Sequence, residues 1–357
     1  MLWKQMNTPI IVDPKDPKWL LLDRVMDITN SRQVKQAMAR HGVIPIDKAG
    51  TILRILFISM FFSLDITFLL SELRKRKRLR QFARISEVPS AQAIYQFVSK
   101  FEEYQFTHLI SDILNSMCRH PSRRKFRKLI VDGSAITLDL NIFRRKFRKK
   151  DLLERDYRWG FSNTRGYYLG FKLTLVVEYP KILPLCVLLH PGSPHDSSLF
   201  EEIMDELKRR RIIQNGDTVI FDKGYFSTRN YQLGVLKYRT IPIIFPRSNF
   251  DIRKAFSKMC YPLTLYSRHD FRIAKREYEN LVSILARELH RWTDFLDIRS
   301  TIEDFFKLVK DALSLKLLHR YSRRSVLKFI CIDVLLAGII ILTGFQSKKQ
   351  LQALAEW

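Results

Sequence analysis

Cysteine and glycine are scarce in this sequence of 357 residues, which contains four and 12 of them. The cysteines, at positions 118, 186, 260 and 331, lack the close spacing of zinc ligands and offer no disulfide framework, which argues against a zinc finger and a disulfide scaffold. No glycine-rich loop of the kind that cradles nucleotide phosphates is present. The segment Met1–Gln5 lacks the basic and apolar regions that begin a signal peptide. We therefore expect a reduced, intracellular protein.

Acidic residues are also few, since 36 Asp and Glu stand against 62 Lys and Arg, and the formal net charge is +26. A charge this high predicts a polyanionic partner, either nucleic acid or an anionic membrane surface. Apolar residues make up 46% of the chain and aromatic residues 12%, which is enough for a sizeable core and argues against global disorder.

Long apolar runs without charge are lacking as well. The run Ile52–Leu70, read as part of one long helix, carries Arg54 and Asp65. The run Phe329–Phe345 is at the short limit for a membrane span and contains Asp333, whose insertion at mid-helix costs about 2.5–3.5 kcal/mol. We interpret this second run as a buried helix that closes a core, with a membrane span as the alternative.

Residues 1–122 favour an all-helical domain. A basic run from Arg74 to Arg80 is followed by Ser86–Phe101, where a Pro-Ser helix start precedes apolar residues at helical spacing. A short helix, a proline turn and a second helix are typical of helix-turn-helix DNA readers, although a plain helical bundle has the same pattern. The sequence therefore predicts a helical domain with a DNA-binding role as one of two interpretations.

Strand patterns begin after residue 123 and alternate with helix patterns. The predicted strands are Lys128–Val131, Tyr167–Tyr179, Ile182–His190, Asp217–Phe221 and Thr240–Phe245. The predicted helices are Ser198–Ile213, 227–238, Ala274–Trp292 and Thr301–Leu318. This mixed order indicates an α/β fold with a mixed sheet flanked by helices, and an insertion at about 249–298 before the last of these helices. The predicted domains are 1–122, 123–345 and a C-terminal tail, 346–357.

Two of the predicted strands lead into an acid that is closely followed by glycine. Asp132-Gly133 follows Leu-Ile-Val, and Asp222-Lys223-Gly224 follows Val-Ile-Phe. Acids at the carboxyl ends of neighbouring strands lie at the sheet edge, where α/β sheets place their sites, and two of them can reach one metal ion. Oxygen ligands without a nearby Cys or His cluster favour Mg²⁺ or Mn²⁺. The alternative is a pair of ordinary turns between strands and loops.

A two-metal site needs a third acid, and Glu303 is the first candidate. At 100° per residue, Arg299, Glu303 and Lys310 share one narrow stripe of a helix, beside an apolar face. An acid flanked by two cations suits a metal ligand next to phosphates. The alternative is a surface Arg–Glu pair at i,i+4, and Glu288 is the next candidate for the third acid.

Three motifs together resemble DDE transposases of bacterial and archaeal insertion sequences. They are Leu-Ile-Val-Asp132-Gly-Ser, Phe221-Asp222-Lys-Gly-Tyr and Arg299-x3-Glu303-x6-Lys310. The most similar type is family four, whose last acid lies in a Tyr-x2-Arg-x3-Glu-x6-Lys motif. Here Leu296 stands at the Tyr position. The resemblance spans roughly residues 125–345.

The resemblance implies an RNase H-like fold and a transposase activity, with cleavage at the element's ends and strand transfer into target DNA. Asp132, Asp222 and Glu303 match the catalytic, metal-binding triad, which holds Mg²⁺ or Mn²⁺, as two ions. Arg299 and Lys310 match phosphate contacts. The implied partners are double-stranded DNA, as terminal inverted repeats and target, and a second copy of the chain in a synaptic homodimer without membrane involvement. The implied location is the cytoplasm of a prokaryote, at the nucleoid when DNA is bound.

Further DNA contacts are predicted from basic and aromatic residues. The basic candidates surround Asp132 in sequence and are Arg123, Arg124, Lys125, Arg144, Arg145, Lys146 and Arg148. Trp159 is a candidate for stacking on an unpaired base. His195-Asp196 is interpreted as a helix cap rather than a general base.

Two other functions stay open at this point. An RNase H-like nuclease would need the same three acids without strand transfer. A decayed transposase would act only as a DNA-binding protein, and the only hint of it is Leu296.

Overall fold

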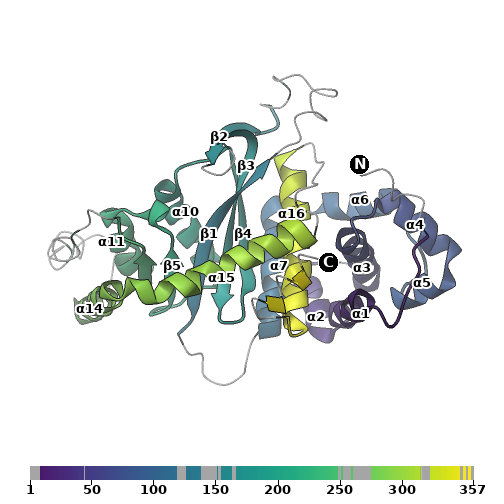
Figure 1. Ribbon diagram of the computed structural model, residues 1–357, viewed down its shortest axis with the longest axis horizontal. Helices are drawn as coiled ribbons and strands as arrows, with labels where there is room; N and C mark the ends of the chain where they lie inside the picture. Colours follow the sequence, from purple (N-terminus) through teal and green to yellow (C-terminus); the bar gives the residue numbers. More distant parts are fainter. Residues whose placement is uncertain are drawn as a thin grey trace. The chain divides into compact units, whose positions relative to one another are not determined.

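The computed structural model divides into two compact units, Met1–Arg119 with Phe305–Trp357, and His120–Asp304 (Figure 1). The residues that the structure describes are 9–43, 45–118, 126–137, 151, 154–162, 166–247, 251, 259, 275–313, 315, 322–345, 349–350 and 353–354. The domain boundaries expected from the sequence stay predictions.

The first unit is helical, as predicted for the N-terminal region. Its long helices are α1 (Pro17–Thr29), α2 (Arg32–Arg40), α3 (Ile46–Phe61), α4 (Ile66–Lys75), α5 (Lys77–Phe82), α6 (Ala91–Lys100), α7 (Glu103–Cys118) and α16 (Arg323–Leu342). Side-chain caps begin several of them, including Asp16 at α1, Ser31 at α2 and Ser90 at α6. The helix start predicted at Pro89-Ser90 is therefore confirmed.

The run Ile52–Leu70 is not one helix, in contrast to the prediction. Helices α3 and α4 meet at an angle of 112°. Ser63 adopts a left-handed conformation between them, and the Asp65 carboxylate accepts hydrogen bonds from the amides of Thr67 and Phe68. The spacing of apolar residues does not reveal this break, because the turn and its cap span only a few residues.

Helix α16 contains the most apolar run of the chain. Among the described helices it alone is by itself long and apolar enough to cross a membrane, and 89% of its most apolar window is buried inside the structure. It packs against α7, α1 and α3, so it forms the centre of the helical unit. This arrangement agrees with the interpretation of a buried helix that closes a core.

A buried lysine joins α16 to the end of α6. The Lys328 ammonium donates hydrogen bonds to the carbonyl oxygens of Val98 at 2.8 Å, Ser99 at 3.3 Å and Phe101. Burial lowers the pKa of Lys328 to about 8. The ammonium thus satisfies carbonyls that the last turn of α6 leaves without helical partners.

The second unit is built on a six-stranded sheet with the order β2-β3-β1-β5-β6, in which β4 also pairs with β3 (Figure 1). The strands are β1 (Lys128–Thr137), β2 (Arg158–Ser162), β3 (Gly166–Tyr179), β4 (Leu183–Pro191), β5 (Thr218–Phe221) and β6 (Ile241–Ile244). Strands β1, β5 and β6 run parallel, and β3 is antiparallel to β1, β2 and β4. This is the mixed sheet of an RNase H-like fold, as predicted.

Helices and 3₁₀ turns accompany the sheet. They are α10 (Asp196–Arg209), η2 (Lys223–Tyr225), α11 (Thr228–Leu236), α14 (Lys275–His290), η4 (Trp292–Phe295) and α15 (Leu296–Lys307). Helix α14 confirms the helix predicted at Ala274–Trp292. The predicted helix Thr301–Leu318 starts earlier, at Leu296, and changes to a π-helical turn, η5 (Leu308–Ala312).

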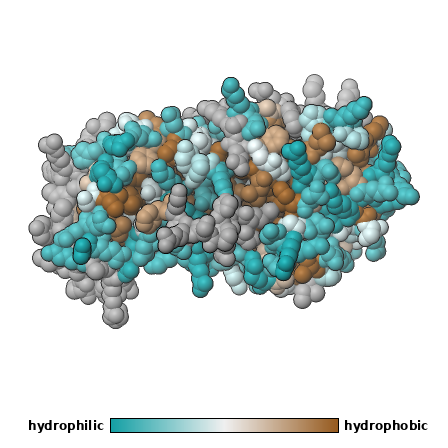
Figure 2. Space-filling model, turned by 90° about the horizontal axis from the view of Figure 1, so that it is seen from below, coloured by the Kyte–Doolittle hydropathy of each residue, from teal (hydrophilic) through white to brown (hydrophobic). Residues whose placement is uncertain are grey.

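Large apolar side chains gather inside each unit, and few of them reach the surface. On the face that Figure 2 shows, hydrophilic residues predominate and hydrophobic ones form small patches. The exposed large apolar residues among those described are Ile11, Leu20, Tyr95, Tyr104, Phe126, Trp159, Phe161, Tyr167 and Leu296. Three of them, Trp159, Phe161 and Tyr167, lie on the β2–β3 hairpin.

Candidate active site

The parallel pairing of β1 with β5 brings Asp132 and Asp222 to adjacent positions. Val131 is the register partner of Phe221 and the last pair of the two strands. The next residue on the β1 side is Asp132, and the next residue on the β5 side is Asp222. Strand β1 does not end at Asp132, however, in contrast to the prediction. It continues to Thr137 because β3 pairs with it over the whole length. Asp132 thus lies within a strand and is held firmly, and its carboxylate accepts the Gly133 amide at 2.8 Å.

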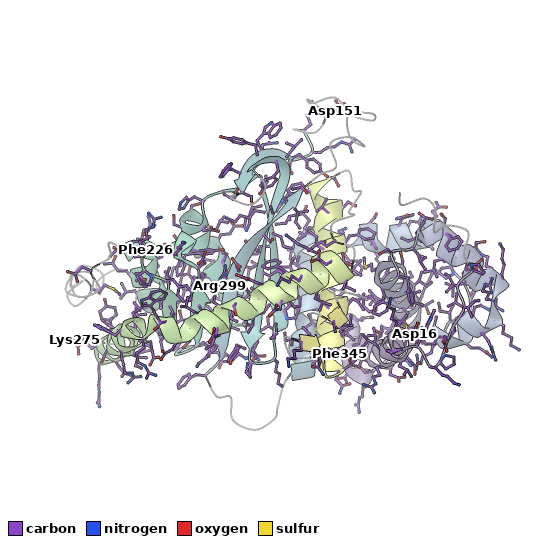
Figure 3. All side chains as sticks on the ribbon, in the orientation of Figure 1. Asp16, Asp151, Phe226, Lys275, Arg299 and Phe345 are labelled. Atoms are coloured by element: carbon purple, nitrogen blue, oxygen red, sulfur yellow. The ribbon has the colours of Figure 1, made fainter. Side chains whose placement is uncertain are left out.

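Helix α15 brings a third carboxylate to the same place. Glu303 and Arg299 lie one turn apart on this helix, and Figure 3 shows Arg299 where α15 crosses the sheet. The Arg299 guanidinium contacts Glu303 Oε1, lies 2.9 Å from Asp132 Oδ2 and lies 4.0 Å from Asp222 Oδ2. Three carboxylates from separate elements therefore share one cation.

Exposure differs among the three acids. The side chain of Asp132 is 14% exposed, that of Asp222 is 35% exposed and that of Glu303 is 52% exposed. Burial raises the pKa of Asp132 to about 6, and the negative charges of Asp222 and Asp196 add to the rise, against the effect of Arg299. Burial lowers the pKa of Arg299, but the charges of Asp132, Asp222 and Glu303 outweigh this effect and raise it. The site thus holds a crowded set of negative charges around a permanent cation.

The carboxylate oxygens of the three acids suit a divalent metal ion, and the Arg299 guanidinium occupies the position of such a cation. Among the described residues, no three His, Cys, Asp or Glu side chains form a ready metal-binding group. The Arg299 guanidinium lies between the carboxylates and keeps them apart. Carboxylate oxygens are the ligands that Mg²⁺ and Mn²⁺ prefer, so the three acids fit such an ion once the guanidinium moves away.

A comparison with protein families decides the identity of the fold. The model of the transposase DDE domain matches residues 123–337, more than half of the chain. The chain belongs to the transposase DDE domain family. Members of this family cleave DNA, transfer strands and depend on divalent metal ions, so this transposase has DNA as its substrate. No curated protein and no solved structure matches the chain.

The transposase geometry distinguishes the two candidates for the third acid. Glu288, on α14, lies 3.2 Å from the Arg287 Nε atom, and within the described part of the chain it pairs with neither Arg299 nor the two aspartates. Glu303 shares the Arg299 guanidinium with both aspartates. The contacts therefore favour Glu303.

The assumption that placed Lys310 on the same stripe does not hold. The 100° step applies only as far as Lys307, because Leu308–Ala312 is π-helical and has more residues per turn. The Lys310 ammonium lies 5.7 Å from the centroid of the Phe306 ring. Its contact with a phosphate stays a prediction.

The remaining DNA-contact candidates lie mostly outside the described residues. Those outside are Arg123, Arg124, Lys125, Arg144, Arg145, Lys146 and Arg148. Trp159 is described, lies on β2 and is 53% exposed, in a row with the cross-strand pair of Phe161 and Tyr167. Its exposure leaves it open to stacking.

The helix-cap interpretation of His195 is confirmed. His195 is the N-cap of α10, and its Nδ1 atom accepts the Ser197 amide at 3.3 Å. The neighbours of Asp196 could not be inferred from the cap motif, because they come from other elements. The signal that could have found them is the pair of glycines after Asp132 and Asp222, since each leaves space that another side chain must fill.

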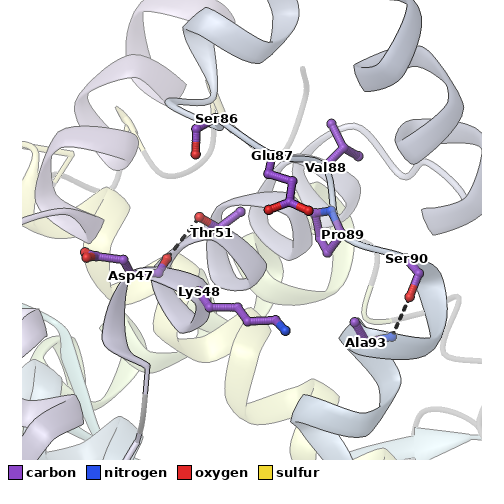
Figure 4. Close-up of a pocket in the computed structure, with 9 residues that line it drawn as sticks. All are labelled: Asp47, Lys48, Thr51, Ser86, Glu87, Val88, Pro89, Ser90 and Ala93. Carbon is purple, nitrogen blue, oxygen red and sulfur yellow. Dashed lines mark hydrogen bonds between the residues drawn. The ribbon is translucent and has the colours of Figure 1, made fainter.

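A cavity of about 440 Å³ lies in the helical unit (Figure 4). It is lined by Asp47, Lys48, Thr51, Ser86, Glu87, Val88, Pro89, Ser90 and Ala93. Two carboxylates and one ammonium give it no excess of positive charge, so it lacks the electrostatics of a phosphate site. DNA contact by the surrounding segment, Ser86–Phe101, stays a prediction.

The raised pKa of Asp132 leads to a testable prediction. Its folded-state pKa of about 6 exceeds the usual 3.8, so ionised Asp132 destabilises the metal-free fold, and this penalty grows as pH rises from 4 to 6. In EDTA at pH 7.5, Asp132→Asn should raise the free energy of unfolding by about 1–3 kcal/mol, with the gain fading towards pH 4. Urea unfolding across pH measures this difference. A less stable variant at pH 7.5 would show that the ion pair with Arg299 outweighs burial.

Proposed function

We propose that this transposase cleaves DNA at its element's ends and joins the freed ends to target DNA through Asp132, Asp222 and Glu303. The observation that carries the proposal is the convergence of these carboxylates on Arg299. Three acids from β1, the end of β5 and α15 converge on one guanidinium, although they come from separate parts of the sequence. A structural role would not require three of them around one cation.

The three carboxylates would hold Mg²⁺ or Mn²⁺, as two ions. Bound ions supply the Lewis acidity that phosphodiester transfer needs. The protein contributes orientation and charge, since β1 and β5 fix the two aspartates and α15 carries the glutamate. Arg299 offsets part of the acids' negative charge while no metal is bound, and once a metal is bound its planar fork becomes free to pair with a phosphate of the DNA.

The DNA partner is double-stranded, as terminal inverted repeats and as target, and it is held by a homodimer in the synaptic complex. Lys310, Trp159 and the basic run around Asp132 in sequence supply its further contacts. Each phosphate that these residues neutralise should add about −0.9 to the slope of log affinity against log salt.

We infer that Leu296 leaves the contacts between Arg299 and the three acids intact. Leu296 is the first residue of α15 and is 44% exposed. Its side chain therefore replaces tyrosine without disturbing the contacts of Arg299 with the acids. A hydroxyl like that of the family-four tyrosine is missing at this position, and the contacts of Arg299 with the three acids do not involve Leu296.

The experiment uses the full chain, the DNA that flanks its gene and a target plasmid, with Mg²⁺ or EDTA. Joined products that need Mg²⁺ are the result expected for a transposase. Cleavage without joining would instead support an RNase H-like nuclease. Salt-sensitive binding without any chemistry would identify a DNA-binding protein that has lost its activity.

A further inference from the structure

One residue at the start of α10, Asp196, lies against both acid-bearing segments. Towards β1, Asp196 contacts Lys172, which lies on the neighbouring strand β3. The Lys172 Nζ atom lies 2.5 Å from Asp196 Oδ1 and donates a hydrogen bond to the Pro194 carbonyl at 3.1 Å. The Lys172 stem covers Gly133, the residue after Asp132. A Cβ atom on Gly133 would lie 2.8 Å from Lys172 Cε and 3.8 Å from Asp196 Oδ1.

On the β5 side, the other oxygen of Asp196 fills the space at Gly224. A Cβ atom on Gly224 would lie 2.6 Å from Asp196 Oδ2. A second contact ties the start of α10 to the turn that follows Asp222, because the Asn230 amide donates to the Ser197 carbonyl at 3.0 Å and to the Tyr225 carbonyl at 2.8 Å. Asp196 is therefore wedged between the turn that follows Asp222 and the strand that carries Asp132.

Asp196 is close enough to influence the charge of the site, although it is not one of the three acids that contact Arg299. Its charge is among those that raise the pKa of Asp132, after burial. Burial raises the pKa of Tyr225 as well, and the charges of Asp196 and Asp132 add to that rise. The Lys172 ammonium neutralises Asp196, so this carboxylate is already engaged by a cation of the protein itself.

We propose that the ion pair of Asp196 and Lys172 is a positioning element that fixes the separation of Asp132 and Asp222. The inference rests on the proposed function, because the separation matters for the binding of a divalent metal between them. The glycines at 133 and 224 are required for the same reason, since a side chain at either position would displace the pair. Residues that orient metal ligands typically contribute about 10–100-fold to metal affinity.

The test measures Mn²⁺ binding to the full-length protein without DNA, by electron paramagnetic resonance. Asp196→Asn keeps the shape of the side chain and removes the charge that holds Lys172. We expect it to weaken Mn²⁺ binding by about 10–100-fold and to slow joining at saturating Mn²⁺. DNA binding in EDTA should stay unchanged.

Asp205→Asn is the matched control. Asp205 lies on the same helix and pairs with Lys237 at 2.9 Å, so its substitution also removes an Asp–Lys pair. Asp205→Asn should lower the melting temperature less, because Lys237 keeps Glu201 as a partner at 2.8 Å, and only Asp196→Asn should weaken Mn²⁺ binding. Unchanged Mn²⁺ affinity in Asp196→Asn would overturn the proposal and leave Asp196 a purely structural residue.

A second variant tests the wedge independently. Gly224→Ala pushes against Asp196 Oδ2 and should reproduce the loss of Mn²⁺ affinity. The double variant with Asp196→Ala should lose no more than Asp196→Ala alone, because both changes act on one contact. Additive losses would contradict the proposal. If Asp132→Asn also kept Mn²⁺ affinity and joining activity, the proposed function itself would fail, which separates the two failures.

Discussion

Single substitutions Asp132→Ala, Asp222→Ala and Glu303→Ala each reduce DNA cleavage and strand transfer by about 10²–10³-fold or more, while DNA binding in EDTA is retained. This result is expected because the three carboxylates converge on one cation and act as one unit. Removing any member leaves too few ligands for the metal that the reaction needs. Timed assays of nicking and joining on DNA ends measure both steps.

Glu288→Ala is the control for the third acid. Glu288 is also a helical glutamate after Asp222, and it contacts Arg287 instead of Arg299. Its substitution should leave both activities within about twofold, since loss of a partly exposed ion pair changes the free energy by less than about 1 kcal/mol. If Glu303→Ala were active and Glu288→Ala inactive, Glu288 and not Glu303 would be the third acid.

Lys328→Met lowers the free energy of unfolding of the helical unit by about 1–3 kcal/mol. The substitution keeps the length of the side chain and removes the donor that the carbonyls of Val98 and Ser99 share. A buried polar group left without a partner costs about 1–3 kcal/mol, and here that group is the Val98 carbonyl, since Ser99 is exposed and its carbonyl can bind water. The Phe101 carbonyl keeps Arg324 as a donor at 2.9 Å. Denaturant unfolding followed by far-UV circular dichroism measures the change.

Lys100→Met is the control for this prediction. Lys100 is exposed in the last turn of α6, so its loss removes a charge of the same sign near the same helix end. The expected change is below about 1 kcal/mol. Equal effects of the two substitutions would show that Lys328 acts only through its charge and that the hydrogen bonds to α6 contribute little.

The positions of the two aspartates could be predicted because their signals are local. A β-rich run, an acid and a glycine stand next to one another, and the parallel pairing of β1 with β5 then places the acids side by side. The extension of β1 to Thr137 could not be predicted in this way. It depends on the pairing with β3, whose residues are distant in sequence.

The preference for Glu303 over Glu288 could be predicted from the sequence, because the helix stripe of Arg299, Glu303 and Lys310 and the family motif both single it out. The contacts of Arg299 with Glu303 and Asp132 agree with that choice. The role proposed for Asp196 could not be predicted, since its neighbours Lys172 and Gly224 come from other elements. The π-helical turn at Lys310 escaped detection because helical periodicity assumes a constant step.

The most direct measurement of the central claim is to map where the metal binds along the chain. Fe²⁺ in place of Mg²⁺, with ascorbate and peroxide, cuts the backbone near its ligands, and the fragments are identified by mass spectrometry. The account predicts cuts near Asp132, Asp222 and Glu303, suppressed by excess Mg²⁺ and weakened in Asp132→Asn. Cuts that cluster elsewhere, or cuts at these three places that Mg²⁺ does not suppress, would contradict a shared metal site formed by the three carboxylates.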